Sequence, residues 1–158
     1  MANCNSTNMP ILENTKLTMN SLEETLNDDR ILRYQLIIKS LTFVMQGTQP
    51  DLAFVVSLCS RFLAKPTAIH IGLAKQVLRY LKGSTNLGIT YHYRNIENLF
   101  VHIDANYQDK TLSGDGKSTL GYRMYLARGL VSWSSRRQHY VTTSSTKSKY
   151  IGQANVVK

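Results

Sequence analysis

The stretch "VLRYLKGSTNLGITYHY", residues 77–93, is where the hydrophobic pattern of the chain changes its period. Before Gly83, apolar residues recur at the spacing of a helix, whereas "LGITYHY" (87–93) alternates as a half-buried strand does. Glycine commonly follows the last turn of a helix, so Gly83 marks the predicted boundary. The stretch therefore predicts helices on its N-terminal side, strands on its C-terminal side, and an α+β fold.

The N-terminal side predicts three helices preceded by a polar arm. Residues 1–29 are rich in Asn, Ser and Thr and weakly periodic, so we expect an extended or disordered arm. After this arm, apolar residues recur at helical spacing in three runs. Gly, Pro and Thr residues between the runs are typical of helix ends and starts. The predicted helices are residues 30–45, 51–64 and 68–82.

The C-terminal side predicts a mainly antiparallel sheet of three to five strands. A hairpin is expected around Arg128 and Gly129, because two alternating runs flank this pair. The last residues, "SSTKSKYIGQANVVK" (144–158), predict the beginning of a further helix. The predicted strands are residues 87–93, 98–107, 118–127, 129–135 and 139–145.

Charge is distributed unevenly along this chain of net charge +9. Residues 1–29 contain five acidic residues and one lysine, whereas residues 116–158 contain eight Lys and Arg residues and no acid. This asymmetry favours contact between the C-terminal part and a polyanion, with a solvated basic surface as the alternative. The apolar runs are too short to span a bilayer, and we recognise no signal peptide. Cys4 and Cys59 indicate neither a disulfide framework nor a metal site.

Several ordered motifs carry a family resemblance over roughly residues 30–158. In the helical part these are Pro50-Asp51, "SRF" (60–62) and "LRYLKG" (78–83). In the predicted sheet they are "IDANYQDK" (103–110), "KSTLGYRMYL" (117–126), "SWSSRRQ" (132–138) and "SSTKSKYI" (144–151). Together they resemble copia-type retrotransposon polyproteins, from the end of the reverse transcriptase into the RNase H domain. The chain departs from that pattern at Lys39, where the family has Gly, and at Gln49, where it has Arg.

The resemblance implies a three-helix lobe followed by an incomplete RNase H-like sheet. The implied domains are the flexible arm at 1–29, a lobe like the reverse-transcriptase tail at 30–83, and a truncated RNase H-like lobe at 84–158. The truncation would leave the strand that carries Asp104 unpaired on one edge. Such an edge favours self-association.

The resemblance also places the RNase H carboxylates, which hold two Mg²⁺ ions. It assigns the first to Asp104, whereas Lys149 stands in place of a metal-binding Glu and Lys147 in place of its companion. An ammonium near a divalent cation costs roughly several kcal/mol even in a surface-like dielectric. We therefore expect no RNase H activity, no metal and no cofactor. The palm of the polymerase is not in the chain, so we expect no polymerase activity either.

Two arginine motifs remain. Arg136 and Arg137 are candidate phosphate contacts, which would give weak nucleic-acid binding as a remnant of hybrid binding. The tetrapeptide "RILR" (Arg30, Ile31, Leu32, Arg33) matches the RxLR translocation motif of oomycete effectors, and the whole chain resembles the secreted RxLR effectors of a downy mildew. The alternative for Arg30 and Arg33 is that they are solvated residues of a first helical turn.

The RxLR resemblance implies a non-catalytic protein that is secreted and then acts in the nucleus or cytoplasm of plant host cells. There it would suppress cell death and immunity through unknown host proteins. The main alternative is a reverse transcriptase/RNase H fragment that acts on RNA–DNA hybrids. A third interpretation is a pseudogene product without a function.

Overall fold

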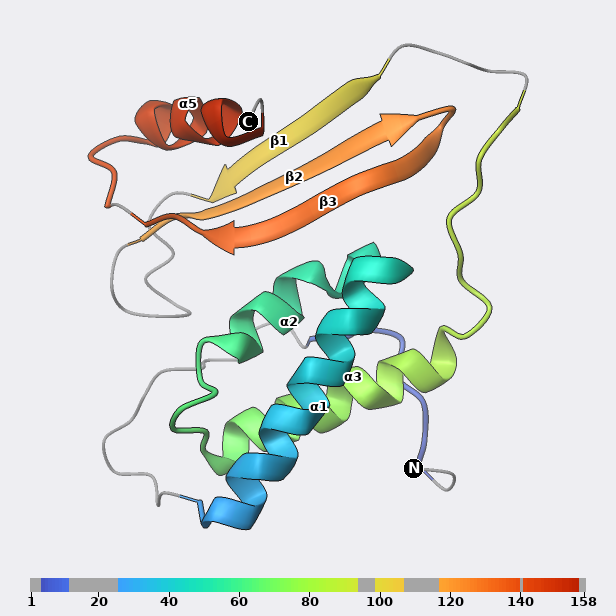
Figure 1. The fold of residues 1–158 in the computed structure, drawn as a ribbon, viewed down its shortest axis with the longest axis vertical. Coiled ribbons are helices and arrows are strands. Elements are labelled where there is room, and N and C mark those ends of the chain that lie inside the picture. Colours follow the sequence, from blue (N-terminus) through green and yellow to red (C-terminus); the bar gives the residue numbers. More distant parts are fainter. Residues whose placement is uncertain (1–3, 12–25, 94–98, 107–116, 140, 157–158) are drawn as a thin grey trace. The chain divides into compact units, whose positions relative to one another are not determined.

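The computed structural model describes residues 4–11, 26–93, 99–106, 117–139 and 141–156 (Figure 1). The chain divides into two compact units, residues 1–87 and 88–158, which are called the helical unit and the sheet unit below. In the described parts of the chain, no helix is long and apolar enough to cross a membrane.

Three α-helices and one short 3₁₀-helix make up the described part of the helical unit. Helix α1 begins two residues before the predicted start because Asn27 caps it: the Asn27 side chain accepts a hydrogen bond from the Arg30 backbone N–H at 3.3 Å. Asp28 and Asp29 in the first turn complement the positive end of the helix. The elements are α1 (Asp28–Gly47), η1 (Pro50–Leu52), α2 (Ala53–Ser60) and α3 (Ala68–Gly83).

The core of the helical unit lies between α1, η1, α2 and α3. Each helix contributes one apolar stripe, as the helical spacing predicts, and α2 is buried on most sides because it is short and central. Tyr34 of α1 donates a hydrogen bond to the Cys59 backbone oxygen at 2.8 Å, which ties α1 to α2. The fully buried side chains of this core include Tyr34, Ile38, Leu41, Leu52, Val55, Val56, Leu58 and Val77.

The segment predicted as an arm is partly structured. Among the described residues 4–11, the backbone oxygens of Cys4 and Asn5 accept hydrogen bonds from Lys82 and Arg79 of α3, both at 2.8 Å. The predicted arm covers residues 1–29, and its residues 12–25 lie outside the described residues.

The sheet unit holds a three-stranded antiparallel sheet in the order β1-β2-β3. Strand β1 (Phe100–Asn106) pairs with β2 (Thr119–Leu126), and β2 pairs with β3 (Gly129–Arg137). The predicted hairpin is present, but its turn residues are Ala127 and Arg128, with φ values of 51° and 61°, one residue earlier than the predicted pair Arg128 and Gly129. Positive φ at both central residues matches the right-handed twist of the strands. Among the described residues, β1 is an edge strand.

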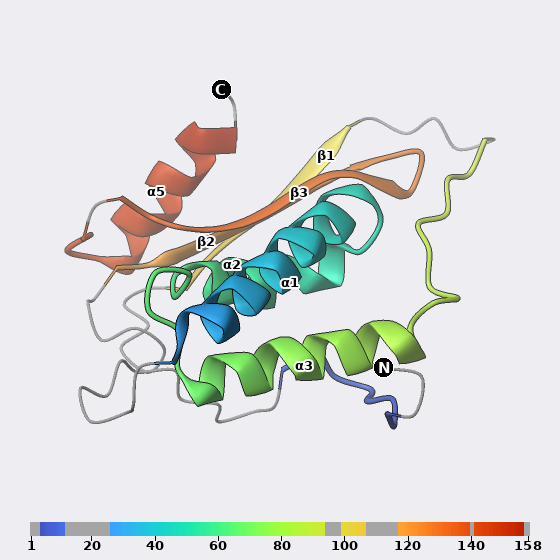
Figure 2. The same cartoon turned by 60° about the horizontal axis from the view of Figure 1, so that its bottom comes forward.

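Two predicted strands are wrong. Residues 87–93 alternate but form no strand, because alternation alone gives no partner; the His92 N–H donates one bond to the Ala127 oxygen at 2.9 Å. In the 139–145 segment, the described residues also form no strand, because the chain turns there into helix α5 (Ser145–Val156). Figure 2 shows α5 on one side of the sheet, and it contacts β1 and β2.

The fold class is therefore α+β: the described residues form four α-helices and an open three-stranded antiparallel sheet. The predicted domain boundary after Gly83 and the assignment of each lobe to a polyprotein domain stay predictions.

Candidate functional site

The two faces of the sheet differ in what they carry. Successive side chains along a strand point to opposite faces, and directly paired residues share a face. One face carries Ile103 and Ala105 of β1 with Leu120 and Tyr122 of β2. Helix α5 covers this face: a Cβ added to Gly152 would lie 2.5 Å from Leu120 Cδ1 and 3.3 Å from Ile103 Cγ2. It is called the helix-covered face.

Asp104 points to the opposite face, since it follows Ile103 along β1 and pairs with Gly121. Its side chain is exposed. Lys147 and Lys149 are also exposed, but on α5. The structure thus places the predicted carboxylate and the two lysines on neighbouring elements, with Asp104 turned away from the face that α5 covers. The roles assigned to these three residues stay predictions.

Ser148, between the two lysines, fixes the first turn of α5. Its side chain is buried, its hydroxyl donates to Gln138 Oε1 at 3.3 Å, and its backbone oxygen accepts from Gln138 Nε2 at 2.9 Å. The Ser144 hydroxyl accepts a bond from the Lys147 N–H at 3.2 Å, which caps the helix. Lys147 and Lys149 therefore flank a side chain that is hydrogen-bonded to Gln138, the residue after β3.

Among the three predicted site residues Asp104, Lys147 and Lys149, only Asp104 carries oxygen atoms that could ligate Mg²⁺. Magnesium requires several oxygen ligands, and the ammonium groups of Lys147 and Lys149 offer none. No group of three or more His, Cys, Asp or Glu residues that could hold a metal occurs within the described ranges. Asp109 and Asp115, which follow β1 in the sequence, lie outside those ranges.

Arg136 and Arg137, the predicted phosphate contacts, lie on opposite faces of β3. Arg136 pairs with Leu120 on the helix-covered face, whereas Arg137 pairs with Thr119 on the other. Arg136 is exposed, and Arg137 is half-buried, with burial lowering the pKa of its guanidinium. A single phosphate-binding patch made of both side chains is not supported by this register, and the role of each stays a prediction.

An aromatic cluster on the face of Asp104 was missed by the sequence analysis. Phe100 and Tyr125, which pair across β1 and β2, stack with ring centroids 5.1 Å apart and an interplanar angle of 9°. His102 is edge-on to both rings at 5.6 Å. Alternation in "NLFVHIDANY" could have placed Phe100 and His102 on one face, but the pairing with Tyr125 depends on the register.

The "RILR" motif lies in the first turns of α1. Arg30, Leu32 and Arg33 are exposed, whereas Ile31 is half-buried. The Ile31 N–H donates to the Asn27 oxygen at 3.1 Å, so the motif is helical. Its location at the start of a helix was predicted, and its role in translocation stays a prediction.

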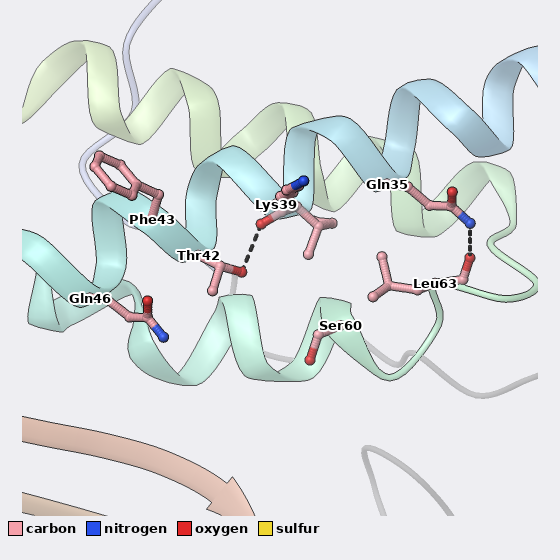
Figure 3. A pocket seen from close by; sticks show the side chains of 8 residues that line it. Gln35, Lys39, Thr42, Phe43, Gln46, Ser60 and Leu63 are labelled. Carbon is pink, nitrogen blue, oxygen red and sulfur yellow. Dashed lines mark hydrogen bonds between the residues drawn. The ribbon is translucent and has the colours of Figure 1, made fainter.

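A groove of about 590 Å³ lies between α1 and the end of α2, and Figure 3 shows the side chains that line it. Gln35 Nε2 donates to the Leu63 oxygen at 2.9 Å and holds the chain after α2 at one end. Phe43 is 80% exposed at the other end of the same wall. The lining residues are Gln35, Ile38, Lys39, Thr42, Phe43, Gln46, Ser60 and Leu63.

The sequence analysis did not find the groove. It identified the apolar stripe of α1 that packs inward, but it did not identify a second series of apolar residues on the same helix. That series includes Leu32 and Leu36, both 56% exposed, and Phe43. An apolar residue outside the buried stripe was the available signal.

Comparisons with known proteins identify relatives of two kinds. The Retrovirus-related Pol polyproteins from transposons RE1 and RE2 of Arabidopsis thaliana are 38% and 35% identical over 77% and 92% of this chain. The chain spans only 8% and 10% of the length of those polyproteins. Secreted RxLR effector protein 161 of Plasmopara viticola is 33% identical over 118 residues, which are 75% of this chain and 82% of that protein.

The chain belongs to this family of copia-type retrotransposon Pol fragments. The resemblance stated from the sequence motifs is thereby confirmed, including the similarity to an RxLR effector. No family model matches the chain, and no solved structure matches it.

Proposed function

We propose that the protein is a non-catalytic effector of the secreted RxLR type, which acts inside plant host cells to suppress cell death and immunity. The observation that carries this proposal is the match to Secreted RxLR effector protein 161 over 82% of the length of that protein. The exposed Arg30 and Arg33 on the first turns of α1 support it, because a receptor or surface can reach them. On this proposal the chain is exported and then enters the host cell.

The lack of catalysis is argued from charge. The resemblance to RNase H domains assigns metal-binding carboxylates to the positions of Lys147 and Lys149, and α5 carries these two lysines there instead. Each exchange of a carboxylate for an ammonium changes the local charge by about two units and adds repulsion toward Mg²⁺. Asp104 alone cannot hold two divalent ions.

Expression in plant leaf tissue together with a cell-death elicitor tests the proposal. We expect less ion leakage from tissue that contains the protein than from tissue with an empty vector. Equal leakage in the two tissues would overturn the effector function. The double variant Arg30→Ala with Arg33→Ala should still act when it is made inside the leaf cell, since the motif serves entry.

A second arm of the experiment tests entry itself. Delivered from outside the cell, the Arg30→Ala, Arg33→Ala variant should lose its effect. A matched variant, Lys65→Ala with Lys75→Ala, removes two exposed basic residues elsewhere on the helical unit and should keep it. Equal loss in both variants would assign the effect to total charge rather than to the motif.

The second candidate is a fragment that acts on RNA–DNA hybrids, and the match to a Pol polyprotein over 92% of the chain favours it. Incubation with a labelled hybrid and Mg²⁺ separates the two functions. The effector proposal expects no cleavage by the protein or by the Asp104→Asn variant. Cleavage that disappears in Asp104→Asn would establish the hybrid-directed function.

A further inference from the structure

The groove between α1 and α2 has an apolar floor and a polar rim. Ile38, 1% exposed, and Leu63 form its floor, and Phe43 stands at one end with most of its ring exposed. Gln35, Lys39, Thr42, Gln46 and Ser60 make up the rim. Large exposed apolar side chains beside a hollow, with polar groups around them, are typical of docking surfaces for other proteins.

The walls of the groove determine which backbone can enter it. One wall is α1, and the other is the end of α2 with the segment after it, where the Leu63 oxygen already accepts a bond from Gln35 Nε2. A helical wall offers no strand edge, so an extended peptide would leave its own backbone groups unpaired over an apolar floor. A helical peptide, in contrast, pairs its backbone N–H and C=O groups within itself. The lining residues of α1 run from Gln35 to Gln46, which is about 16 Å, or three helical turns.

The charge of the groove selects the partner further. Lys39 is the one charged residue among the eight that line it, and none of the eight carries a carboxylate. A second copy of this chain is a poor occupant: a two-fold pairing of α1 with itself about its middle would bring Lys39 against its own copy. Like charges at such a contact are repulsive.

We propose that this groove binds an amphipathic helix of another protein, with Phe43 as the apolar anchor and Lys39 paired to a carboxylate of that helix. This inference rests on the proposed effector function, and it names the kind of host protein that such an effector would bind. The chemistry required is an apolar stripe over about three turns with Asp or Glu beside it.

Two synthetic peptides of about fourteen residues test this inference with the full chain. Both carry the same Leu and Phe stripe at helical spacing, and they differ only in having Glu or Lys at the flanking positions. Fluorescence anisotropy of the labelled peptides measures binding. We expect the Glu peptide to bind at least about tenfold more tightly than the Lys peptide. A Glu peptide with a central proline, which cannot form the helix, should not bind.

Variants of the protein locate the site. Phe43→Ala should weaken the Glu peptide at least about tenfold, because it removes the anchor. Lys39→Glu, a surface change that leaves the apolar floor intact, should reverse the preference toward the Lys peptide. Ile69→Ala is the matched control: Ile69 is 44% exposed on α3 and lies outside the groove lining, so binding should not change.

Four results would overturn the inference: no binding of either peptide, equal binding of both, equal binding of the proline peptide, or binding unaffected by Phe43→Ala. A dimer seen by sedimentation velocity and lost in Phe43→Ala would assign the groove to a second copy instead. These measurements are made in solution. Failure of the peptides to bind would therefore not contradict the host-cell assay. Likewise, an absence of effector activity in plant tissue would not change the result of the peptide measurements.

Discussion

The interiors of the helical unit and of the sheet unit are stabilised by different interactions. In the helical unit the fully buried side chains are mostly apolar, such as Leu52 and Leu58, both 0% exposed. In the described part of the sheet unit, the buried apolar residues Ala105, Leu120 and Leu130 each keep 8% of their surface exposed. The more deeply buried side chains there are polar: Ser118, Thr142, Ser148 and Gln138.

These polar side chains form one hydrogen-bonded region at the junction of β3, the following segment and α5. The Ser118 and Thr142 hydroxyls lie 3.3 Å apart, and the Gln138 N–H donates to the Ser118 oxygen at 2.8 Å. Gln138 also holds Ser148 of α5. Each hydrogen bond contributes only about 1 kcal/mol net, less than burial of a large apolar side chain. The sheet unit is therefore expected to unfold before the helical unit.

The largest expected difference between the units comes from matched Leu→Ala substitutions. Leu58→Ala should lower the free energy of unfolding of the helical unit by about 2–5 kcal/mol, because it leaves a cavity in a closed core. Leu130→Ala, at a residue that is partly open, should cost less in the sheet unit. Circular dichroism reports mainly the helical unit, because three of the four described α-helices lie there, and fluorescence of Trp133, the only tryptophan, reports the sheet unit.

The comparison would fail if the two substitutions cost the same.

The helical unit was the better predicted of the two for a physical reason. A helix satisfies its own backbone, so a local apolar period is enough to place it. Of the apolar positions at helical spacing in residues 30–45, namely 34, 37, 38, 41, 44 and 45, three (34, 38 and 41) are buried and the others are half-buried. His70 of α3 was expected at the surface or half-buried, and this expectation is wrong. It is 1% exposed because its ring accepts a bond from the Thr67 N–H at 2.9 Å and packs on Phe62 at 4.0 Å.

Strands need a partner that the local sequence does not reveal. Residues 87–93 have the alternation but pair with no strand. The hairpin of β2 and β3 was predicted because its two strands follow one another directly in the sequence. The candidate site was limited in the same way. The sequence could identify Asp104, Lys147 and Lys149, but the face on which each lies depends on register and on the packing of Gly152.

Alkaline pH should destabilise the helical unit, through a group that the sheet unit lacks among its described residues. Burial raises the pKa of the Cys59 thiol to about 11 from 9.0. The thiol therefore stays protonated in the fold while it ionises in the unfolded chain. Its contribution is fully present below pH 9 and is lost as the pH rises toward 11, by about 2–3 kcal/mol in total. Burial also raises the pKa of Tyr34, which extends the loss to higher pH.

Chemical unfolding followed by circular dichroism from pH 8 to 10 measures this slope. The control is Cys59→Ala, which removes the thiol but keeps the backbone oxygen that Tyr34 uses. It should flatten the slope below pH 10, whatever its effect on stability at pH 8. An unchanged slope in Cys59→Ala would assign the alkaline loss to other groups.

Removing the Gln138 side chain should affect the sheet unit alone. Gln138→Ala leaves the buried Ser148 hydroxyl and backbone oxygen without this partner, which costs about 1–3 kcal/mol. Trp133 fluorescence should report an earlier transition, with the helical unit unchanged. Gln153→Ala, at an exposed position of α5, is the matched control and should have little effect. A double-mutant cycle with Ser148→Ala should show coupling, and additive losses would contradict the pairing.

The smallest effect compares two glycines inside helices. At Gly72 of α3 an added Cβ would meet nothing within 4 Å, so Gly72→Ala should stabilise the helical unit by about 0.5–1 kcal/mol through reduced backbone entropy. At Gly152 of α5 the same gain is opposed, because the Cβ would lie 2.5 Å from Leu120 Cδ1 and push α5 from the sheet. Gly152→Ala should therefore destabilise the sheet unit. A gain at both glycines in thermal melts would show that α5 packs more loosely than Ile103 and Leu120 indicate, and would weaken the placement of Lys147 and Lys149 beside β1.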